Sequence, residues 1–300
     1  MATSTGALGP TQEVALPEGR IRYHERGQGH PIVFVHGIIA NADVWRHVVP
    51  PLAEHYRCIT PDWPLGGHER PMHEGTDFSL FGLADLVDRT LAALEIDACT
   101  LVGNDTGGAI CQAVAARHPE RLAHLVLTPC DAFTNFLPPP IKHLQLLGRT
   151  PIGLKVLAET LRFRAIHRLP IAFGLLTRRP IPDDIMASYT GPLRDHAGTR
   201  RDFARLVRAI STRYTEEAAS GLSAFGRPTL LAWSRQNFFP LAHAERLAGR
   251  LPRAELEIID DSGPFVGEDQ PRAVAEHIDR FVAAHTGSAG RAGGVVNKSP

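Results

Sequence analysis

Short apolar runs alternate with longer amphipathic stretches along most of the chain. Eight of the runs have the length and the β-branched content that are typical of buried strands. The stretches 42–55, 80–94 and 109–117 have helical patterns. Strands that alternate with helices predict parallel βαβ units and an α/β fold whose mostly parallel sheet has helices on both faces. The predicted strands are Glu13–Leu16, Ile21–Glu25, Ile32–Val35, Cys58–Thr60, Thr100–Gly103, Leu122–Leu127, Thr229–Trp233 and Glu255–Ile259.

The alternation stops after Asp131 and resumes at Arg227. Between these positions the chain consists of helical stretches and loops, with breaks at prolines such as Pro138–Pro140. We expect this segment to form an inserted helical cap whose apolar residues roof a pocket. The predicted organisation is a core of residues 1–131 and 216–285, a helical cap of residues 132–215, and a disordered, Gly- and Ala-rich tail of residues 286–300.

The segment Leu101–Gly108 combines a buried strand, a sharp turn and the start of a helix. Its sequence Gly-Asn-Asp-Thr-Gly has the form Gly-x-Asp-x-Gly, in which Asp105 stands at the tip of the turn. A turn of this kind exposes one side chain above the sheet and directs backbone N–H groups at it. Asp also tolerates the positive φ that such a tip requires. In the simpler interpretation Asp105 only caps the following helix.

Two further motifs precede this turn. The apolar run Ile32–Val35 ends in His36-Gly37, and the run ending at Asp62 continues as Asp-Trp-Pro-Leu-Gly. In this order of strands, helices and motifs, residues 12–285 resemble the α/β-hydrolase superfamily. An aspartate at the elbow is similar to the branch that contains haloalkane dehalogenases, fluoroacetate dehalogenases and soluble epoxide hydrolases.

The resemblance implies a mechanism and a set of residues. The elbow carboxylate, here Asp105, displaces a leaving group from an sp³ carbon, and a histidine oriented by a second acid activates water to hydrolyse the resulting ester. Backbone N–H groups form the oxyanion hole, and the corresponding donors in this chain are Thr106 and Ile38.

The histidine and the acid of that mechanism are missing from their usual places. Pro264 occupies the position of the histidine in Gly263–Pro271, and proline neither accepts nor donates a proton. The acid position after the seventh strand offers Gln236 or Asn237. Asp131, after the sixth strand, is the candidate substitute acid, and His68, in the loop after the fourth strand, is the candidate substitute base.

Two histidines of the cap, His143 and His167, are weaker candidates for that base. The Asp105 carboxylate lies at a predicted helix N-terminus beside N–H donors, and we therefore expect it to stay ionised with a depressed pKa. Desolvation under an apolar cap opposes this effect.

The composition of the chain limits the kinds of binding partner that we expect. The 32 acidic residues balance the 32 basic residues, so we expect no nucleic-acid or membrane partner. No signal peptide and no apolar run of about 20 residues is visible, and the four cysteines suit buried, reduced thiols. We expect a cytoplasmic protein that binds a small-molecule substrate or ligand without metal or organic cofactor. A homodimer is left open.

These patterns predict an enzyme that acts on a small, largely apolar molecule with Asp105 at its elbow. Loss of the histidine favours an atypical or non-hydrolytic reaction: cyclisation, elimination or isomerisation. One alternative is a hydrolase of the epoxide, alkyl halide or ester type with a substitute base. Another is a non-catalytic small-molecule binder on a hydrolase fold.

Overall fold

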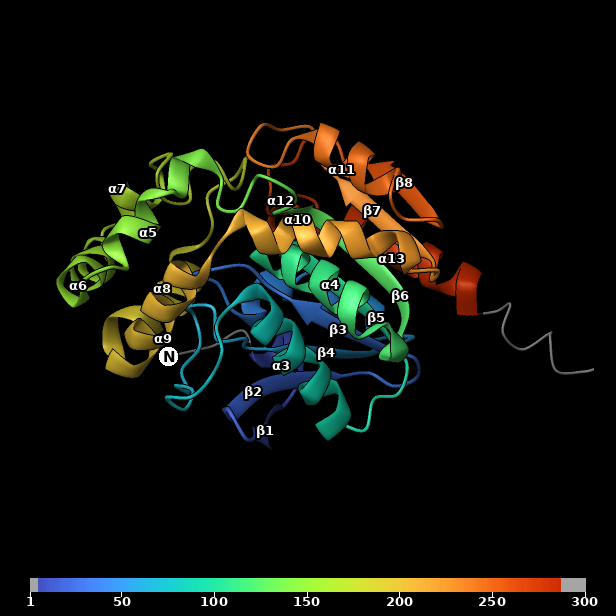
Figure 1. The fold of residues 1–300 in the computed structure, drawn as a ribbon, viewed down its shortest axis with the longest axis horizontal. Coiled ribbons are helices and arrows are strands. Elements are labelled where there is room, and N and C mark those ends of the chain that lie inside the picture. Colours follow the sequence, from blue (N-terminus) through green and yellow to red (C-terminus); the bar gives the residue numbers. More distant parts are fainter. Residues whose placement is uncertain (1–4, 287–300) are drawn as a thin grey trace, which may run out of the picture.

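The computed structural model describes residues 5–286 and centres on an eight-stranded sheet in the order β1-β2-β4-β3-β5-β6-β7-β8 (Figure 1). β2 pairs antiparallel with β1 and β4, and all other neighbouring strands pair parallel. Each predicted strand overlaps an observed one, so the predicted fold class is confirmed. The strands are β1 (Thr11–Leu16), β2 (Gly19–Arg26), β3 (Pro31–Val35), β4 (Arg57–Pro61), β5 (Cys99–Asp105), β6 (Leu122–Cys130), β7 (Thr229–Trp233) and β8 (Ala254–Ile258).

Burial explains which strands are central. All residues of β5 are buried, and β3 reads Ile-Val-Phe-Val after its first residue, as a strand covered on both faces requires. β4 lies on one side of β3 and β5 on the other, so the chain crosses over β3 between β4 and β5 and the direction of strand addition reverses between β3 and β5. Ligands of open α/β sheets bind at such a point, outside the carboxyl ends of the strands.

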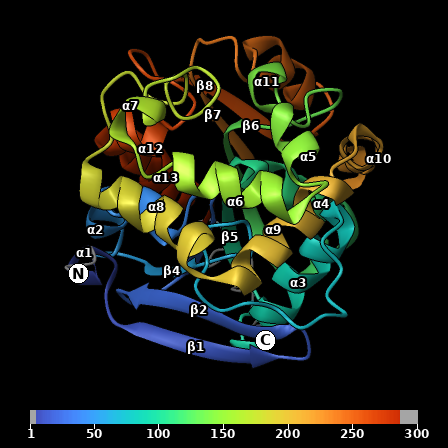
Figure 2. The same cartoon turned by 90° about the vertical axis from the view of Figure 1, so that its left-hand side faces the viewer.

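Helices cover both faces of the sheet (Figure 2). None of the described helices is long and apolar enough to cross a membrane. α3, α4 and α10 pack together on one face, while α2 and α13 contact each other on the other face. The helices of the core are α1 (Thr5–Leu8), α2 (Val49–Leu52), α3 (Leu80–Ala93), α4 (Thr106–Arg117), α10 (Thr212–Gly221), α11 (Leu241–Ala248), α12 (Val266–Asp269) and α13 (Pro271–Thr286).

The stretch 42–55 is not the single helix that its pattern predicts. It forms the 3₁₀ turn η1 (Ala42–Trp45) and the short helix α2, whose first turn contains Pro50 and Pro51. Proline has no N–H to donate to the preceding turn and clashes with it, so a helix arriving from Ala42 must end before this pair.

Residues between β6 and α10 form the cap, which stands at one end of the sheet in Figure 1. α10 packs on α4 and α3, so the chain has returned to the core by Thr212, four residues before the predicted boundary. The predicted tail lies outside the described residues, apart from Thr286. The cap helices are α5 (His143–Leu147), α6 (Pro151–Thr160), α7 (Arg164–His167), α8 (Asp183–Asp195) and α9 (Ala197–Ala209).

Candidate active site

Asp105 stands at the junction of β5 and α4 with φ 56° and ψ −135°. The turn is possible because small residues surround it. A Cβ on Gly107 would lie 2.3 Å from the Val35 carbonyl oxygen, and a Cβ on Gly37 would lie 2.5 Å from Cγ of Asp105. The glycines therefore let the end of β3, the elbow and the first turn of α4 approach closely.

Two backbone N–H groups bind the Asp105 carboxylate. The Thr106 N–H donates to Oδ1 over 2.5 Å, and the Ile38 N–H donates to the same carboxylate. The predicted depression of the Asp105 pKa is nevertheless wrong, because only 2% of the residue is exposed and desolvation raises the pKa from its ordinary value of 3.8 to about 6. The hydrogen bonds from Thr106 and Ile38 limit this rise.

Asp131 lies directly beside the elbow because β6 is the neighbour of β5. Its N–H donates to the Asp105 carbonyl oxygen over 3.3 Å, and the Thr106 hydroxyl donates to its Oδ2 over 3.0 Å. Oδ1 of Asp131 is buried and has no hydrogen-bond partner among the described residues. Burial, followed by the charge of Asp105, raises the pKa of Asp131 well above its ordinary value. The pKa values of both carboxyl groups are raised, so the pair holds a proton more tightly than two exposed aspartates do.

Pro264, Gln236 and Asn237 occupy the positions predicted to have lost the histidine and the acid. Pro264 is next to the elbow, since its carbonyl oxygen accepts a 3.0 Å hydrogen bond from the side chain of Asn104. Gln236 binds both the N–H and the carbonyl oxygen of Phe239, and Asn237 is exposed. None of these three side chains supplies a titratable group.

The structure does not bring His68 to Asp105. Its ring is buried against the cap helix α9: Nε2 lies 3.4 Å from Oδ2 of Asp202, and Nδ1 accepts a 3.3 Å hydrogen bond from the Gly66 N–H. His68 does not line the cavity above the elbow. These contacts do not support His68 as the base, which stays a prediction, because sequence position in a loop does not reveal which partner the ring will face.

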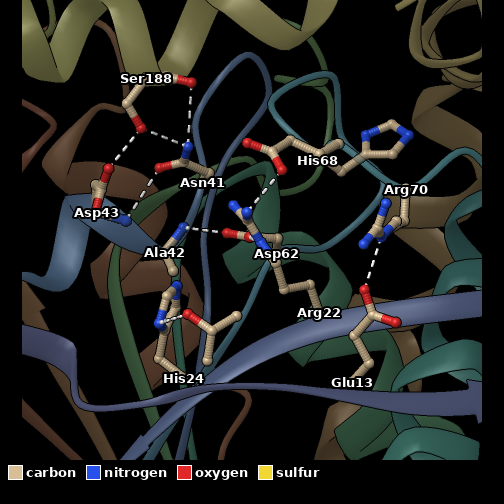
Figure 3. A network of polar contacts seen from close by, with 12 residues as sticks. Glu13, Arg22, His24, Asn41, Ala42, Asp43, Asp62, His68, Arg70 and Ser188 are labelled. Carbon is tan, nitrogen blue, oxygen red and sulfur yellow. Dashed lines mark hydrogen bonds and ion pairs between the residues drawn. The ribbon is translucent and has the colours of Figure 1, made fainter. Parts of the chain in front are cut away.

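A polar network joins the cap to the loop that carries the Ile38 N–H (Figure 3). Asn41 donates to Oγ of Ser188 on α8 over 2.8 Å, and this hydroxyl donates to Asp43 over 2.5 Å. Asp62 accepts from the Ala42 N–H over 3.0 Å. These bonds fix the loop after β3 relative to the cap and so hold the Ile38 donor in place.

A cavity of about 260 Å³ lies between the elbow and the cap. Its floor includes Asp105, and the only other side chains with polar atoms that line it within residues 5–286 are His143 and Thr160. Nδ1 of His143 contacts the Pro140 carbonyl oxygen over 3.1 Å, which requires a proton on Nδ1 and leaves Nε2 free of that contact. The apolar wall includes Leu144, Leu157, Leu161, Ile166, Phe173 and Leu176.

Comparison with known proteins agrees with this architecture. The family model described as alpha/beta hydrolase fold matches residues 30–271. The chain belongs to the α/β-hydrolase fold family.

Members of this family that resemble the chain include enzymes of two kinds. A cis-3-alkyl-4-alkyloxetan-2-one decarboxylase of Shewanella oneidensis is 29% identical over 280 residues, which cover 88% of this chain and 85% of the relative. Haloalkane dehalogenase 2 of Mycobacterium bovis is 28% identical over 290 residues, which cover 88% of this chain and 92% of the relative. The resemblance to the dehalogenase and epoxide hydrolase branch is thereby confirmed.

A solved structure shows the same fold. A loop variant of a haloalkane dehalogenase from Bradyrhizobium elkanii superimposes with a TM-score of 0.75 at 21% identity, covering 94% of this chain and 99% of that one.

The arrangement restricts the chemistry that this α/β-hydrolase-fold protein can perform. An ionisable carboxylate faces an apolar cavity, with two N–H donors behind it and a second carboxyl group beside it. Within residues 5–286 no group of three His, Cys, Asp or Glu side chains is placed to hold a metal ion. The four cysteines are free and buried, as predicted, and burial raises the thiol pKa of Cys111 and Cys130, which lie closest to the elbow.

Proposed function

We propose that the protein is a non-hydrolytic enzyme that eliminates carbon dioxide from a small, strained and largely apolar lactone, with Asp105 as the nucleophile. The observation that carries the proposal is the combination of an intact elbow with Pro264 in the place of the histidine. An aspartyl ester can form at such a site, but the residue that normally activates water to hydrolyse it is absent.

A β-lactone provides a route that needs no water. The Asp105 carboxylate attacks C4 of the oxetan-2-one ring, the C4–O bond breaks, and its electron pair leaves a carboxylate on the substrate. The bond from C3 to this carboxylate then breaks, carbon dioxide departs, and the electron pair forms the C3–C4 double bond. Asp105 is expelled as a carboxylate from C4. The electrons balance, and no water, proton or oxidant is consumed.

The electrostatics suit both steps. With a pKa of about 6, Asp105 is mostly ionised at neutral pH and more basic than an exposed aspartate. The N–H groups of Ile38 and Thr106 stabilise the same carboxylate when it leaves, which is the role we propose for the predicted oxyanion hole. A protonated Asp131 avoids a second negative charge beside the nucleophile.

The cavity and the relative support this substrate class. The wall above Asp105 is apolar, and the Shewanella relative is by name a decarboxylase of cis-3-alkyl-4-alkyloxetan-2-ones. A cavity of about 260 Å³ suits a ring with short alkyl substituents.

The test is a product analysis with a cis-3,4-dialkyloxetan-2-one, a 1-haloalkane and an epoxide, each followed by gas chromatography and mass spectrometry. We expect alkene and carbon dioxide from the lactone, and a loss of roughly 10³-fold or more in Asp105→Asn. A β-hydroxy acid as the sole lactone product, or activity that survives in Asp105→Asn, contradicts the proposal.

One observation favours a second candidate. Nε2 of His143 belongs to the only imidazole that lines the cavity within the described residues, so a hydrolase that uses His143 as its base is the competing function. Diol, alcohol or hydroxy acid products that disappear in His143→Gln would identify it. A ligand recovered chemically unchanged would instead identify a binder.

A further inference from the structure

Large apolar side chains are strongly exposed on the cap. Among the described residues, every exposed large hydrophobic side chain lies between positions 146 and 175. The exposed fraction ranges from 40% for Leu169 to 76% for Ile152. Clusters of exposed apolar side chains mark interaction sites more often than chance. The members are Leu146, Ile152, Val156, Phe163, Leu169, Ile171 and Leu175.

The same segment is strongly basic. Residues 142–179, which we name the cap surface, contain eight Lys and Arg and one acidic residue, Glu159, in a chain whose net charge is zero. Asp183, just after the segment, pairs with Arg164, and Asp261, which follows β8 of the core, pairs with Arg179. Four exposed cations of the cap surface form no ion pair with any described residue: Lys142, Arg149, Lys155 and Arg168.

Basic and apolar groups share one face of α6. Ile152, Lys155 and Val156 are exposed and lie within one turn of each other, whereas Leu154 and Ala158 are buried. Figures 1 and 2 show α6 on the outside of the cap, on the side away from the strands. The helix therefore presents a surface on which aliphatic side chains are flanked by a cation.

This surface is continuous with the catalytic cavity. Val156, Leu169 and Ile171 are exposed and also line the cavity above Asp105. We call these three residues the mouth of the cavity. An apolar molecule that enters the cavity there from the cap surface reaches the carboxylate of Asp105 without crossing a polar layer.

The combination selects one occupant. A second copy is disfavoured because two surfaces with the same excess of positive charge repel each other. Nucleic acid matches the cations but leaves the aliphatic side chains in water. An anionic bilayer matches both, because its headgroups attract Lys and Arg while its interface buries apolar side chains.

We propose that the cap surface docks on an anionic lipid surface, with the mouth of the cavity facing the bilayer. Delivery of an alkyl-substituted substrate from the membrane to Asp105 rests on the proposed function, whereas the docking does not.

Flotation with vesicles tests the docking. We expect the intact chain to float with vesicles of phosphatidylcholine and phosphatidylglycerol, to bind pure phosphatidylcholine far more weakly, and to dissociate as salt is added. Each neutralised cation is expected to weaken the partition about fivefold, so Lys155→Gln with Arg168→Gln lowers it roughly 25-fold. Ile152→Ser with Val156→Ser lowers binding without changing the salt dependence.

Matched control variants distinguish binding through the cap surface from a general effect of the protein's charge. Arg235→Gln with Arg272→Gln removes the same charge from exposed positions on the core and leaves binding unchanged. Asp105→Asn binds vesicles like the wild type, so docking is measured even if the lactone is no substrate. Equal losses in the cap and core variants, or no flotation with anionic vesicles, overturn the proposal; an acidic protein then becomes the partner to seek.

Discussion

Replacing Asp105 with Asn should abolish activity and stabilise the protein at neutral pH. Burial raises the folded-state pKa of this carboxyl from 3.8 to about 6, so the folded protein holds the proton more tightly than the unfolded chain. The carboxyl group contributes full stability below pH 3.8, and this contribution falls as the pH rises through about 6. A rise of the pKa from 3.8 to about 6 corresponds to a loss of up to about 3 kcal/mol in the free energy of unfolding at neutral pH, and an uncharged Asn does not cause this loss.

Urea unfolding between pH 4 and pH 8 measures the effect. The free energies of unfolding of Asp105→Asn and the wild type should be close at pH 4 and diverge to about 3 kcal/mol by pH 7, which corresponds to roughly 5 °C in Tm for a chain of 300 residues. Asp260→Asn makes the same chemical change at an exposed side chain and should stay within about 0.5 kcal/mol of the wild type at every pH. A variant that is no more stable at pH 7 than at pH 4, relative to the wild type, refutes the reasoning.

Three further predictions concern the elbow. The kcat/KM of the wild type should rise with pH through an apparent pKa of about 6, because Asp105 must be ionised to attack; a profile flat from pH 5 to pH 8 contradicts this. Asp131→Asn should retain kcat within about tenfold, since Asn resembles a protonated carboxyl; a fall of about 10³-fold would assign Asp131 an ionised, orienting role. Gly37→Ala places a Cβ 2.5 Å from Cγ of Asp105 and should lower kcat about 10²-fold, with circular dichroism showing an unchanged fold.

The fold was predictable because its signals are local. The central strands β3 and β5 are short apolar runs that end in recognisable turns, and the glycines around Asp105 mark the close approach of strand and helix. The prediction of a helix over 42–55 was wrong because the apolar pattern continues through Pro50 and Pro51, whereas the helical backbone hydrogen bonds do not.

The site was predictable only in part. The place of Asp105 and the approach of Asp131 follow from adjacent strand ends, but the sign of the Asp105 pKa shift depends on burial, which the cap determines. His68 and Thr160 show the limit most clearly. The first faces Asp202 instead of the elbow, and the second reaches the cavity from a helix whose pattern carries no signal of this role.

Charge balance shows the same limit at the surface. The equal numbers of acidic and basic residues predict no membrane partner, but they conceal a local excess of cations between residues 142 and 179. Only the structure reveals that these cations accompany exposed apolar side chains at the mouth of the cavity. The proposed docking therefore departs from the expectation drawn from composition.

The most direct test of the central claim, that the elbow aspartate works without activated water, is isotopic. The enzyme is turned over many times on the lactone in H₂¹⁸O, and the peptide that contains Asp105 is then analysed by mass spectrometry. Elimination returns both original carboxylate oxygens, so we predict no ¹⁸O in the wild-type peptide. Pro264→His, which restores a water activator beside the elbow, should divert the ester to hydrolysis and label Asp105. Label in the wild-type peptide would contradict the account, because it would mean that water attacks the aspartyl ester.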